Sequence, residues 1–327
     1  MKAVTTALDR MIEAQPEALE AVAGLDLSGP ARRLADARRI FLVGTGTSQH
    51  AAELGARLLT GLGLDARWSN AAQFALSNAP LRSGDVAILI THTAETAYTA
   101  RGRAKVQASE ADLISLTGAG RGWPEAIETP THEESETYTV SYTAALAVLA
   151  GIGHHLGAAG TSAEDVRAVA ARVRELCADP AALPVAVPAR AMAIVGPGAW
   201  GVTAREGALK LREGARMLCE GFDAELFLHG EAVPYTSADG LVLLQPAADA
   251  DGLTAALGAA AQAEGIHVTT LEESWTPQSE LLAQIPMTVR LQLLAARFAG
   301  LRGQDPDTAI VGAWAAPELW KIGAPSA

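Results

Sequence analysis

The chain has 327 residues, a formal net charge of −12 at pH 7 and a pI near 5.1. This acidic balance argues against nucleic-acid binding, which needs a concentrated basic face. Hydrophobic residues make up 49% of the chain and the mean hydropathy is +0.17, so we expect substantial cores or a buried subunit interface. Cys177 and Cys219 provide neither a disulfide framework nor a metal-ligand spacing, and both are expected to be buried small hydrophobes.

Residues 1–37 are predicted to form an N-terminal helical arm of two short pieces, with a break between Asp26 and Pro30. The first residues have a charged amphipathic pattern that differs from a signal peptide. No apolar run in the chain approaches the roughly 20 residues that span a bilayer. We therefore expect no membrane partner and a cytoplasmic location.

The segment Ile40–Leu59 recurs 152 positions later as Met192–Leu211. In each copy an apolar run ends in Gly-x-Gly and leads into an Ala-rich helical pattern, which is typical of a buried strand that feeds a helix through a turn. The repeat predicts two α/β halves. The matching positions are Gly44, Gly46, Ala52, Gly55, Ala56 and Leu59, and Gly196, Gly198, Ala204, Gly207, Ala208 and Leu211.

The first half is predicted over residues 38–158, where strands and helices alternate. Such alternation predicts a parallel sheet with helices on both faces. The expected strands are Ile40–Val43, Asp85–Thr91 and Asp112–Thr117, and the expected helices are Gln49–Leu62 and Thr96–Ala108.

Residues 159–188 are predicted to connect the halves by a helix, Ala163–Cys177 with Ser162 as N-cap, and a proline-rich linker, Pro180–Pro188. The second half follows over residues 189–303. Its expected strands are Met192–Val195, Leu241–Leu244 and Ile266–Thr270, and its expected helices are Ala199–Leu218, Gly252–Ala263 and Met287–Leu301.

The C-terminal tail, residues 304–327, contains Trp314, Trp320 and Lys321. Its aromatic content predicts that it packs on another part of the molecule.

Short hydroxyl side chains follow two neighbouring predicted strands of the first half. Thr47 and Ser48 come after the first strand, and Thr91, Thr93 and Thr96 come at or after the end of the next. Hydroxyls beside the free N–H groups of a helix start bind a phosphate without a cation, and ligands gather at the carboxyl edge of a parallel sheet. The set therefore predicts a phosphate site. The alternative for any one of these residues is a helix cap or a turn.

Glu206, Lys210 and Glu213 lie at i, i+4 and i+7, so they share one face of the helix predicted in the second half. For Glu206 and Lys210 two interpretations stay open, a row of exposed salt bridges and a part of an active site.

Four segments carry a family resemblance in the same order along the chain. They are MIEAQPEAL at Met11–Leu19, GTGTS at Gly44–Ser48, ITHTAET at Ile90–Thr96, and EGALKLRE at Glu206–Glu213 followed by FLHG at Phe227–Gly230. With them the chain resembles the double sugar-isomerase (SIS) domain proteins, in particular the isomerase half of glucosamine-6-phosphate synthase and the related aminosugar-phosphate deaminases and deglycases. The resemblance implies two tandem flavodoxin-like domains, the first for sugar-phosphate binding and the second with the catalytic base.

The resemblance also implies roles for single residues. Glu213 corresponds to the base that moves a proton between C1 and C2 of the sugar, and Lys210 is a further catalytic candidate on the same face. His229 corresponds to a histidine that opens the sugar ring from the neighbouring subunit, which implies a homodimer with shared active sites. Lys321 is the nearest candidate for a Schiff-base lysine, and the alternative is a solvated terminal lysine. The implied sugar-phosphate ligands are Thr45, Gly46, Thr47, Ser48, Thr91, His92, Thr93 and Thr96.

The chain departs from the family pattern at several of these positions. Ala94 stands where the family has a glycine, which matters if the turn needs a positive φ. His92 replaces a common glutamine, and it is either a solvated loop histidine or a contact to the ligand. Thr91 and Thr93 replace serines, and Glu231 replaces a proline.

These features predict an aminosugar-phosphate deaminase/isomerase that acts on a hexosamine 6-phosphate or a fructosamine-type phosphate by C1/C2 proton transfer and imine hydrolysis. Synthesis from glutamine is not expected, since the sequence shows no glutaminase part. The alternatives are an aldose-ketose sugar-phosphate isomerase and a non-catalytic sugar-phosphate sensor. No metal or cofactor is expected, because the sequence lacks a His, Cys, Asp and Glu cluster and the third glycine of a nicotinamide fingerprint.

Overall fold

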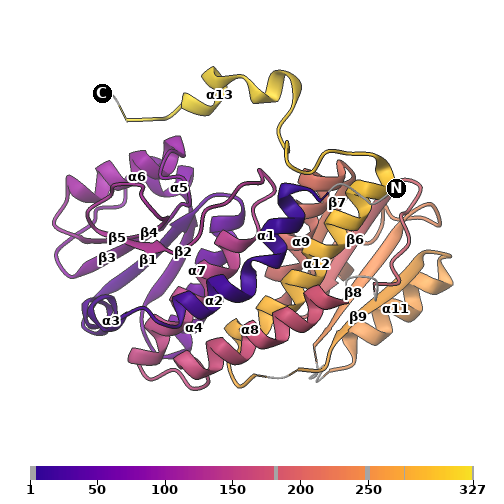
Figure 1. The fold of residues 1–327 in the computed structure, drawn as a ribbon, viewed down its shortest axis with the longest axis horizontal. Coiled ribbons are helices and arrows are strands. Elements are labelled where there is room, and N and C mark those ends of the chain that lie inside the picture. Colours follow the sequence, from indigo (N-terminus) through magenta and orange to yellow (C-terminus); the bar gives the residue numbers. More distant parts are fainter. Residues whose placement is uncertain (1–4, 180–182, 247–250, 276, 326–327) are drawn as a thin grey trace.

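The computed structural model describes residues 5–179, 183–246, 251–275 and 277–325. Two parallel sheets with flanking helices lie side by side along the long axis of the molecule (Figure 1). The strand order is β2-β1-β3-β4-β5 in the first sheet and β7-β6-β8-β9 in the second. The second order repeats the first without its fifth strand, so the repeat in the sequence corresponds to a repeated α/β topology.

The first sheet contains the three predicted strands and two that the sequence analysis missed. The missed strands, β2 and β5, lie at the two edges of the sheet and lack the continuous apolar run of a central parallel strand. The strands are β1 Arg39–Gly44, β2 Ala66–Asn70, β3 Asp85–Ile90, β4 Asp112–Gly118 and β5 Ala126–Thr129.

Five helices accompany this sheet among the described residues. α7 is buried along almost its whole length, and α8 begins with a capping box between Ser162 and Asp165. The helices are α4 Thr47–Gly61, α5 Ala71–Leu76, α6 Ala97–Gln107, α7 Val140–His155 and α8 Ala163–Ala178.

The second half differs from the sequence prediction at two helices and at the edge strand β7, which the sequence analysis missed. The helix expected to reach Leu218 ends at Ala215, because Arg216 adopts a left-handed conformation (φ 49°) and Leu218 begins a strand. The helix expected from Met287 starts at Glu280 and runs through Pro286, since burial of its apolar side chains outweighs the hydrogen bond that proline removes. The elements are β6 Ala191–Gly196, α9 Trp200–Ala215, β7 Leu218–Asp223, α10 Ala224–Leu226, the π-helical turn η2 Phe227–Glu231, β8 Gly240–Pro246, α11 Leu253–Ala263, β9 His267–Glu273 and α12 Glu280–Arg302.

The N-terminal region has three helices where two pieces were predicted: α1 Ala7–Glu13, α2 Gln15–Val22 and α3 Ser28–Ala35. They are part of the core, since Leu8 and Leu19 are fully buried in one cluster with α7, α8 and α12. The interpretation as an arm is therefore not confirmed. Figure 1 shows α1 and α2 along the middle of the molecule, where they contact both halves.

The segment between the halves is packed where it is described. Of the predicted linker Pro180–Pro188, residues 180–182 lie outside the described residues. Leu183 and Val185 are buried in the core of the second half, together with Cys219. Cys177 is only half-buried, so the expectation of two buried cysteines holds fully for Cys219 alone.

The first glycine of each Gly-x-Gly turn allows a helix to approach the end of its strand. A Cβ on Gly44 would lie 2.4 Å from the backbone of Ser48, and one on Gly196 would lie 2.6 Å from the backbone of Trp200. Such distances leave no room for a side chain, so both copies of the repeat keep the glycine for a steric reason.

The C-terminal tail contains the 3-10 turn η3 Gly312–Ala315 and the short helix α13 Pro317–Lys321. Figure 1 shows it crossing from the end of α12 to lie above the first half. Its start is held by the first half, since Thr137 Oγ1 donates to the Pro306 carbonyl at 2.7 Å. The tail therefore contacts the first half, but its two tryptophans contribute little to this packing, since Trp314 is 76% and Trp320 55% exposed.

Candidate functional site

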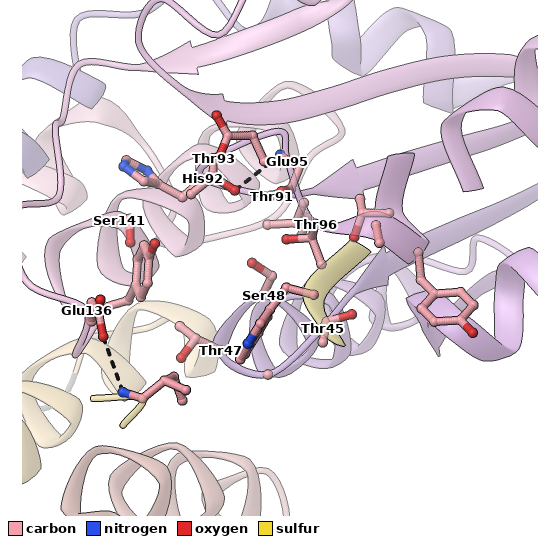
Figure 2. A pocket seen from close by; sticks show the side chains of 18 of the residues that line it. Thr45, Thr47, Ser48, Thr91, His92, Thr93, Glu95, Thr96, Glu136 and Ser141 are labelled. Carbon is pink, nitrogen blue, oxygen red and sulfur yellow. Dashed lines mark hydrogen bonds between the residues drawn. The ribbon is translucent and has the colours of Figure 1, made fainter. Parts of the chain in front are cut away.

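A cavity of about 930 Å³ lies between the carboxyl edge of the first sheet and the C-terminal tail. Glu213 from the second half and Lys321 from the tail also line it, so three separate parts of the chain meet there. Figure 2 shows the labelled hydroxyl side chains of the two loops gathered in this region. All eight predicted sugar-phosphate ligands line the cavity: Thr45, Gly46, Thr47, Ser48, Thr91, His92, Thr93 and Thr96.

Several of these hydroxyls are free to meet a ligand. The N-cap of α4 is Gly46, and Thr96, the N-cap of α6, makes no capping hydrogen bond through its side chain. Ser48 is thus not a helix cap, and Thr96 occupies the N-cap position of α6 while its hydroxyl makes no capping hydrogen bond. Thr93 accepts a hydrogen bond from the Glu95 N–H at 3.2 Å, which leaves its own proton available. Thr47 is engaged elsewhere, as it donates to Glu206 at 3.1 Å.

Ala94 lies in the left-handed region with φ 59°. A residue with a Cβ pays roughly 1–2 kcal/mol for this conformation, whereas glycine adopts it freely. The turn therefore does need the backbone that the family glycine provides, and the chain stores strain beside the cavity.

His92 is half-buried and lines the cavity, so the interpretation as a solvated loop histidine is wrong, and a contact to the ligand stays a prediction. Figure 2 shows its ring directed away from Thr47, Ser48 and Thr96. Burial lowers its pKa to about 4, with Arg121 and His132 adding to the effect. The neutral ring accepts a hydrogen bond at Nε2 from the Glu133 N–H at 3.2 Å, so its position orders that loop.

Glu206 and Lys210 are fully buried, so the exposed salt-bridge interpretation is wrong. The Lys210 Nζ lies 2.7 Å from Glu213 Oε2 and 3.5 Å from Glu206 Oε1. Glu206 Oε2 lies 2.6 Å from His50 Nδ1 of α4, so α9 contacts the first half through this cluster. Lys210 does not line the cavity; it holds the carboxylate of Glu213, which does.

The pKa values of this cluster follow from burial and the single cation. Burial raises the pKa of Glu213, and Lys210 offsets this only in part, so the net shift is upward. Burial acts in the same direction on Glu206, but Lys210 and His50 outweigh it and leave its pKa lowered. Burial opposes the charge of Lys210, yet Glu213 and Glu206 raise its pKa and keep it protonated.

The sequence analysis did not single out Glu133, which is half-buried and lies near this cluster. Its carboxylate accepts hydrogen bonds from the backbone and hydroxyl of both Thr139 and Ser141, at 2.8–3.2 Å. Burial raises its pKa despite these bonds and the charge of Lys210. The run of hydroxyl residues before the apolar helix α7 was the available signal for this loop.

The other two predicted catalytic residues have different surroundings. The side chain of His229 is 69% exposed, pairs with Glu225 at 2.8 Å and does not line the cavity of its own chain. Lys321 lines the cavity and is exposed, so the structure keeps both interpretations of it open. Earlier in the tail, the Ile310 N–H donates to Glu136 at 3.2 Å, which Figure 2 draws as a dashed line.

Comparison with protein families decides the nature of the first half. Residues 33–150 match the family model of the SIS domain. This part of the chain is an SIS domain. The matched residues contain the first sheet through β5 and the loops with the hydroxyl side chains, which agrees with the resemblance found in the sequence. Among curated proteins none matches the chain.

Solved structures extend the likeness from the SIS domain to both halves. The C-terminal domain of glucosamine-fructose-6-phosphate aminotransferase from Francisella tularensis has a TM-score of 0.80 at 17% identity, covering 94% of this chain and 99% of that one. Tagatose-6-phosphate ketose/aldose isomerase from Escherichia coli gives 0.78 at 17%, with 94% and 96% covered. Glucosamine-6-phosphate deaminase from Thermotoga maritima gives 0.76 at 17%, with 92% and 97% covered. At this identity the likenesses establish a shared fold.

No described helix is both long and apolar enough to cross a membrane.

Proposed function

We propose that the chain is a double SIS domain enzyme that moves a proton between C1 and C2 of an aminosugar phosphate and hydrolyses the resulting imine. The observation that carries this proposal is the position of Glu213, a carboxylate with a raised pKa on the same cavity as the hydroxyl loops of the SIS domain. A general base works best when its pKa lies near the working pH. The three structural relatives named above act on sugar phosphates, which supports the substrate class.

In this mechanism the phosphate binds at the starts of α4 and α6, near Ser48, Thr93 and Thr96. Helix N-termini favour the anion, and the hydroxyls donate to it. Glu213 then takes a proton from C2 of an open-chain 2-amino sugar and returns it to C1. In the same step the C1 aldehyde oxygen gains a proton and the amine nitrogen loses one, so that C1 becomes an alcohol and the amine becomes a C2 imine. Water adds to the imine carbon and ammonia leaves, which gives the ketose phosphate. With a fructosamine-type phosphate the proton moves from C1 to C2, and the amine leaves from a C1 imine.

The test is to incubate the protein with glucosamine 6-phosphate and with a fructosamine 6-phosphate and to measure ammonia or amine release. Release with matching formation of fructose 6-phosphate or glucose 6-phosphate supports deamination. Interconversion of glucose 6-phosphate and fructose 6-phosphate without release favours the aldose-ketose isomerase. Binding of these compounds without turnover favours the sensor. If none of them binds, the proposal is wrong.

The hydroxyl loops provide a first prediction. Replacing Ser48 and Thr96 together by alanine is expected to weaken fructose 6-phosphate binding by at least about 10²-fold, because each hydrogen bond to a charged group contributes roughly 1.5–3 kcal/mol. Titration calorimetry measures the affinity. Ser237→Ala, an exposed site in the second half, is the control and should bind normally. A double variant that is folded and binds as tightly as the unaltered protein would contradict the phosphate site.

The surroundings of His229 support a homodimer with shared sites. Leu226, Leu228 and Val233 beside it are 56%, 57% and 83% exposed, an apolar surface that a second copy would cover. In such a dimer His229 reaches the partner's cavity.

This arrangement can be tested by mixing inactive chains. Differently tagged Glu213→Gln and His229→Ala chains should form heterodimers with about half of the normal activity, because one of the two shared sites then has both groups intact. Each variant alone provides the inactive control. Heterodimers that form but remain inactive would rule out the shared site.

A further inference from the structure

Four residues that line the cavity each carry a buried hydroxyl group without a hydrogen-bond partner among the described residues. They are Thr91, Thr99, Thr117 and Tyr142, each at most 3% exposed. Buried hydroxyls are nearly always hydrogen-bonded, since a buried hydroxyl without a partner has lost its hydrogen bonds to water and gained none in exchange. Their presence on one cavity indicates that an occupant of the cavity supplies the missing bonds.

The four groups come from four different elements. Thr91 follows β3, Thr99 lies in the first turn of α6, Thr117 lies in β4 and Tyr142 lies in α7. Only Thr91 was among the ligands predicted from the sequence. Side chains from separate elements are placed by packing, so their convergence on one cavity is a property of the tertiary structure.

The charges around Tyr142 indicate which part of a ligand fits there. Burial raises the pKa of its hydroxyl well above the ordinary value, and the nearby carboxylates of Glu206 and Glu53 raise it further. The hydroxyl therefore stays protonated and can donate a hydrogen bond to an uncharged group. A phosphate is better placed at the helix starts near Ser48 and Thr96, where the partial charge is positive.

We propose that Thr99, Thr117 and Tyr142 form a subsite for the uncharged, hydroxyl-bearing part of a sugar phosphate, with Tyr142 as a specificity-determining residue. The inference rests on the proposed function. Protein hydroxyls both donate and accept hydrogen bonds, as sugar hydroxyls do. A buried polar site of this kind selects for ligands that form hydrogen bonds with it, because an analogue that lacks the sugar hydroxyl leaves the protein hydroxyl unpaired.

Tyr142→Phe separates a role in ligand binding from a structural role, because the affinity for sugar phosphates should fall while the stability of the ligand-free protein does not. The change removes an unmet buried hydroxyl and keeps the ring, so the urea midpoint of the ligand-free protein should stay equal or rise. Affinity for fructose 6-phosphate and glucosamine 6-phosphate should fall about tenfold. Affinity for inorganic phosphate should not change, because that anion binds at the helix starts.

Thr254→Val is the matched control. Thr254 Oγ1 is also buried without a partner, but it lies in α11 of the second half and does not line the cavity. Its replacement should affect the urea midpoint as Tyr142→Phe does and leave all three affinities unchanged. Thr117→Val, measured in the same way, tests the subsite independently if Tyr142→Phe does not fold.

The outcomes are distinct. Weaker sugar-phosphate binding with normal inorganic-phosphate binding supports the subsite. Unchanged sugar-phosphate affinity in Tyr142→Phe means that the ligand does not bond to the hydroxyl, and it overturns the subsite alone. An equal loss of affinity for inorganic phosphate also overturns the subsite, since the effect of the substitution is then not confined to the sugar part of the ligand. If the unaltered protein binds inorganic phosphate but neither sugar phosphate, both the subsite and the proposed function are wrong.

Discussion

Replacing Glu213 by glutamine is expected to lower turnover by at least about 10²-fold while the substrate still binds, as for loss of a positioned general base. Glutamine keeps the shape of the side chain and can still accept a hydrogen bond from Lys210, so packing is preserved. Steady-state kinetics on the substrate that the release assay identifies gives kcat and KM. Exchange of the C2 proton with deuterated solvent, followed by NMR, should disappear in the same variant.

The pH profile adds a second measurement on the unaltered protein. The base acts in its deprotonated form, and burial raises the pKa of Glu213, so kcat/KM should fall on the acid side at a pH above the ordinary glutamate value of about 4.3. Glu264→Gln, an exposed site at the end of α11, is the control and should keep normal turnover. A folded, ligand-binding Glu213→Gln protein with normal turnover and exchange would refute the assignment.

Replacing Lys210 by methionine is expected to destabilise the protein by roughly 3–5 kcal/mol, because Glu206 and Glu213 then lose their shared cation in a buried place. Urea unfolding at pH 8 measures the change. Without the lysine, the pKa of both carboxyl groups rises in the folded protein above its value in the unfolded chain. Below the unfolded-state pKa both groups are protonated and burial costs no charge, whereas at higher pH the folded state must bury ionised carboxylates and loses stability. The difference in the free energy of unfolding between Lys210→Met and the unaltered protein should therefore shrink from pH 8 toward pH 5.

Two further variants make the test of Lys210 specific. Lys321→Met changes an exposed lysine and should alter stability by less than about 0.5 kcal/mol. Adding Glu206→Gln to Lys210→Met removes one uncompensated charge and should recover part of the loss, even if the single variant does not fold. Equal stability of Lys210→Met and the unaltered protein at pH 8 would mean that the cluster does not depend on the lysine.

The repeated architecture was predictable because its signals are local. Gly44 and Gly196 mark turns in which a side chain would clash with the following helix, and apolar runs mark the central strands. The edge strands β2 and β5 carry no such run, and the sequence analysis missed them. The helix expected from Met287 begins earlier, at Glu280, because burial of apolar side chains on both sides of Pro286 carries α12 through a residue that usually ends a helix.

By itself the sequence determined the two α/β halves, the hydroxyl loops and the helix face with Glu206, Lys210 and Glu213, because these depend on neighbours within one or two turns. The tertiary structure decided what those residues experience. Packing of α9 against α4 buries Lys210 between carboxylates and turns a possible surface salt bridge into a cluster with shifted pKa values. His229, in a separate turn, lies away from the cavity of its own chain. Burial and dielectric surroundings arise only when distant segments meet, so no local pattern could predict them.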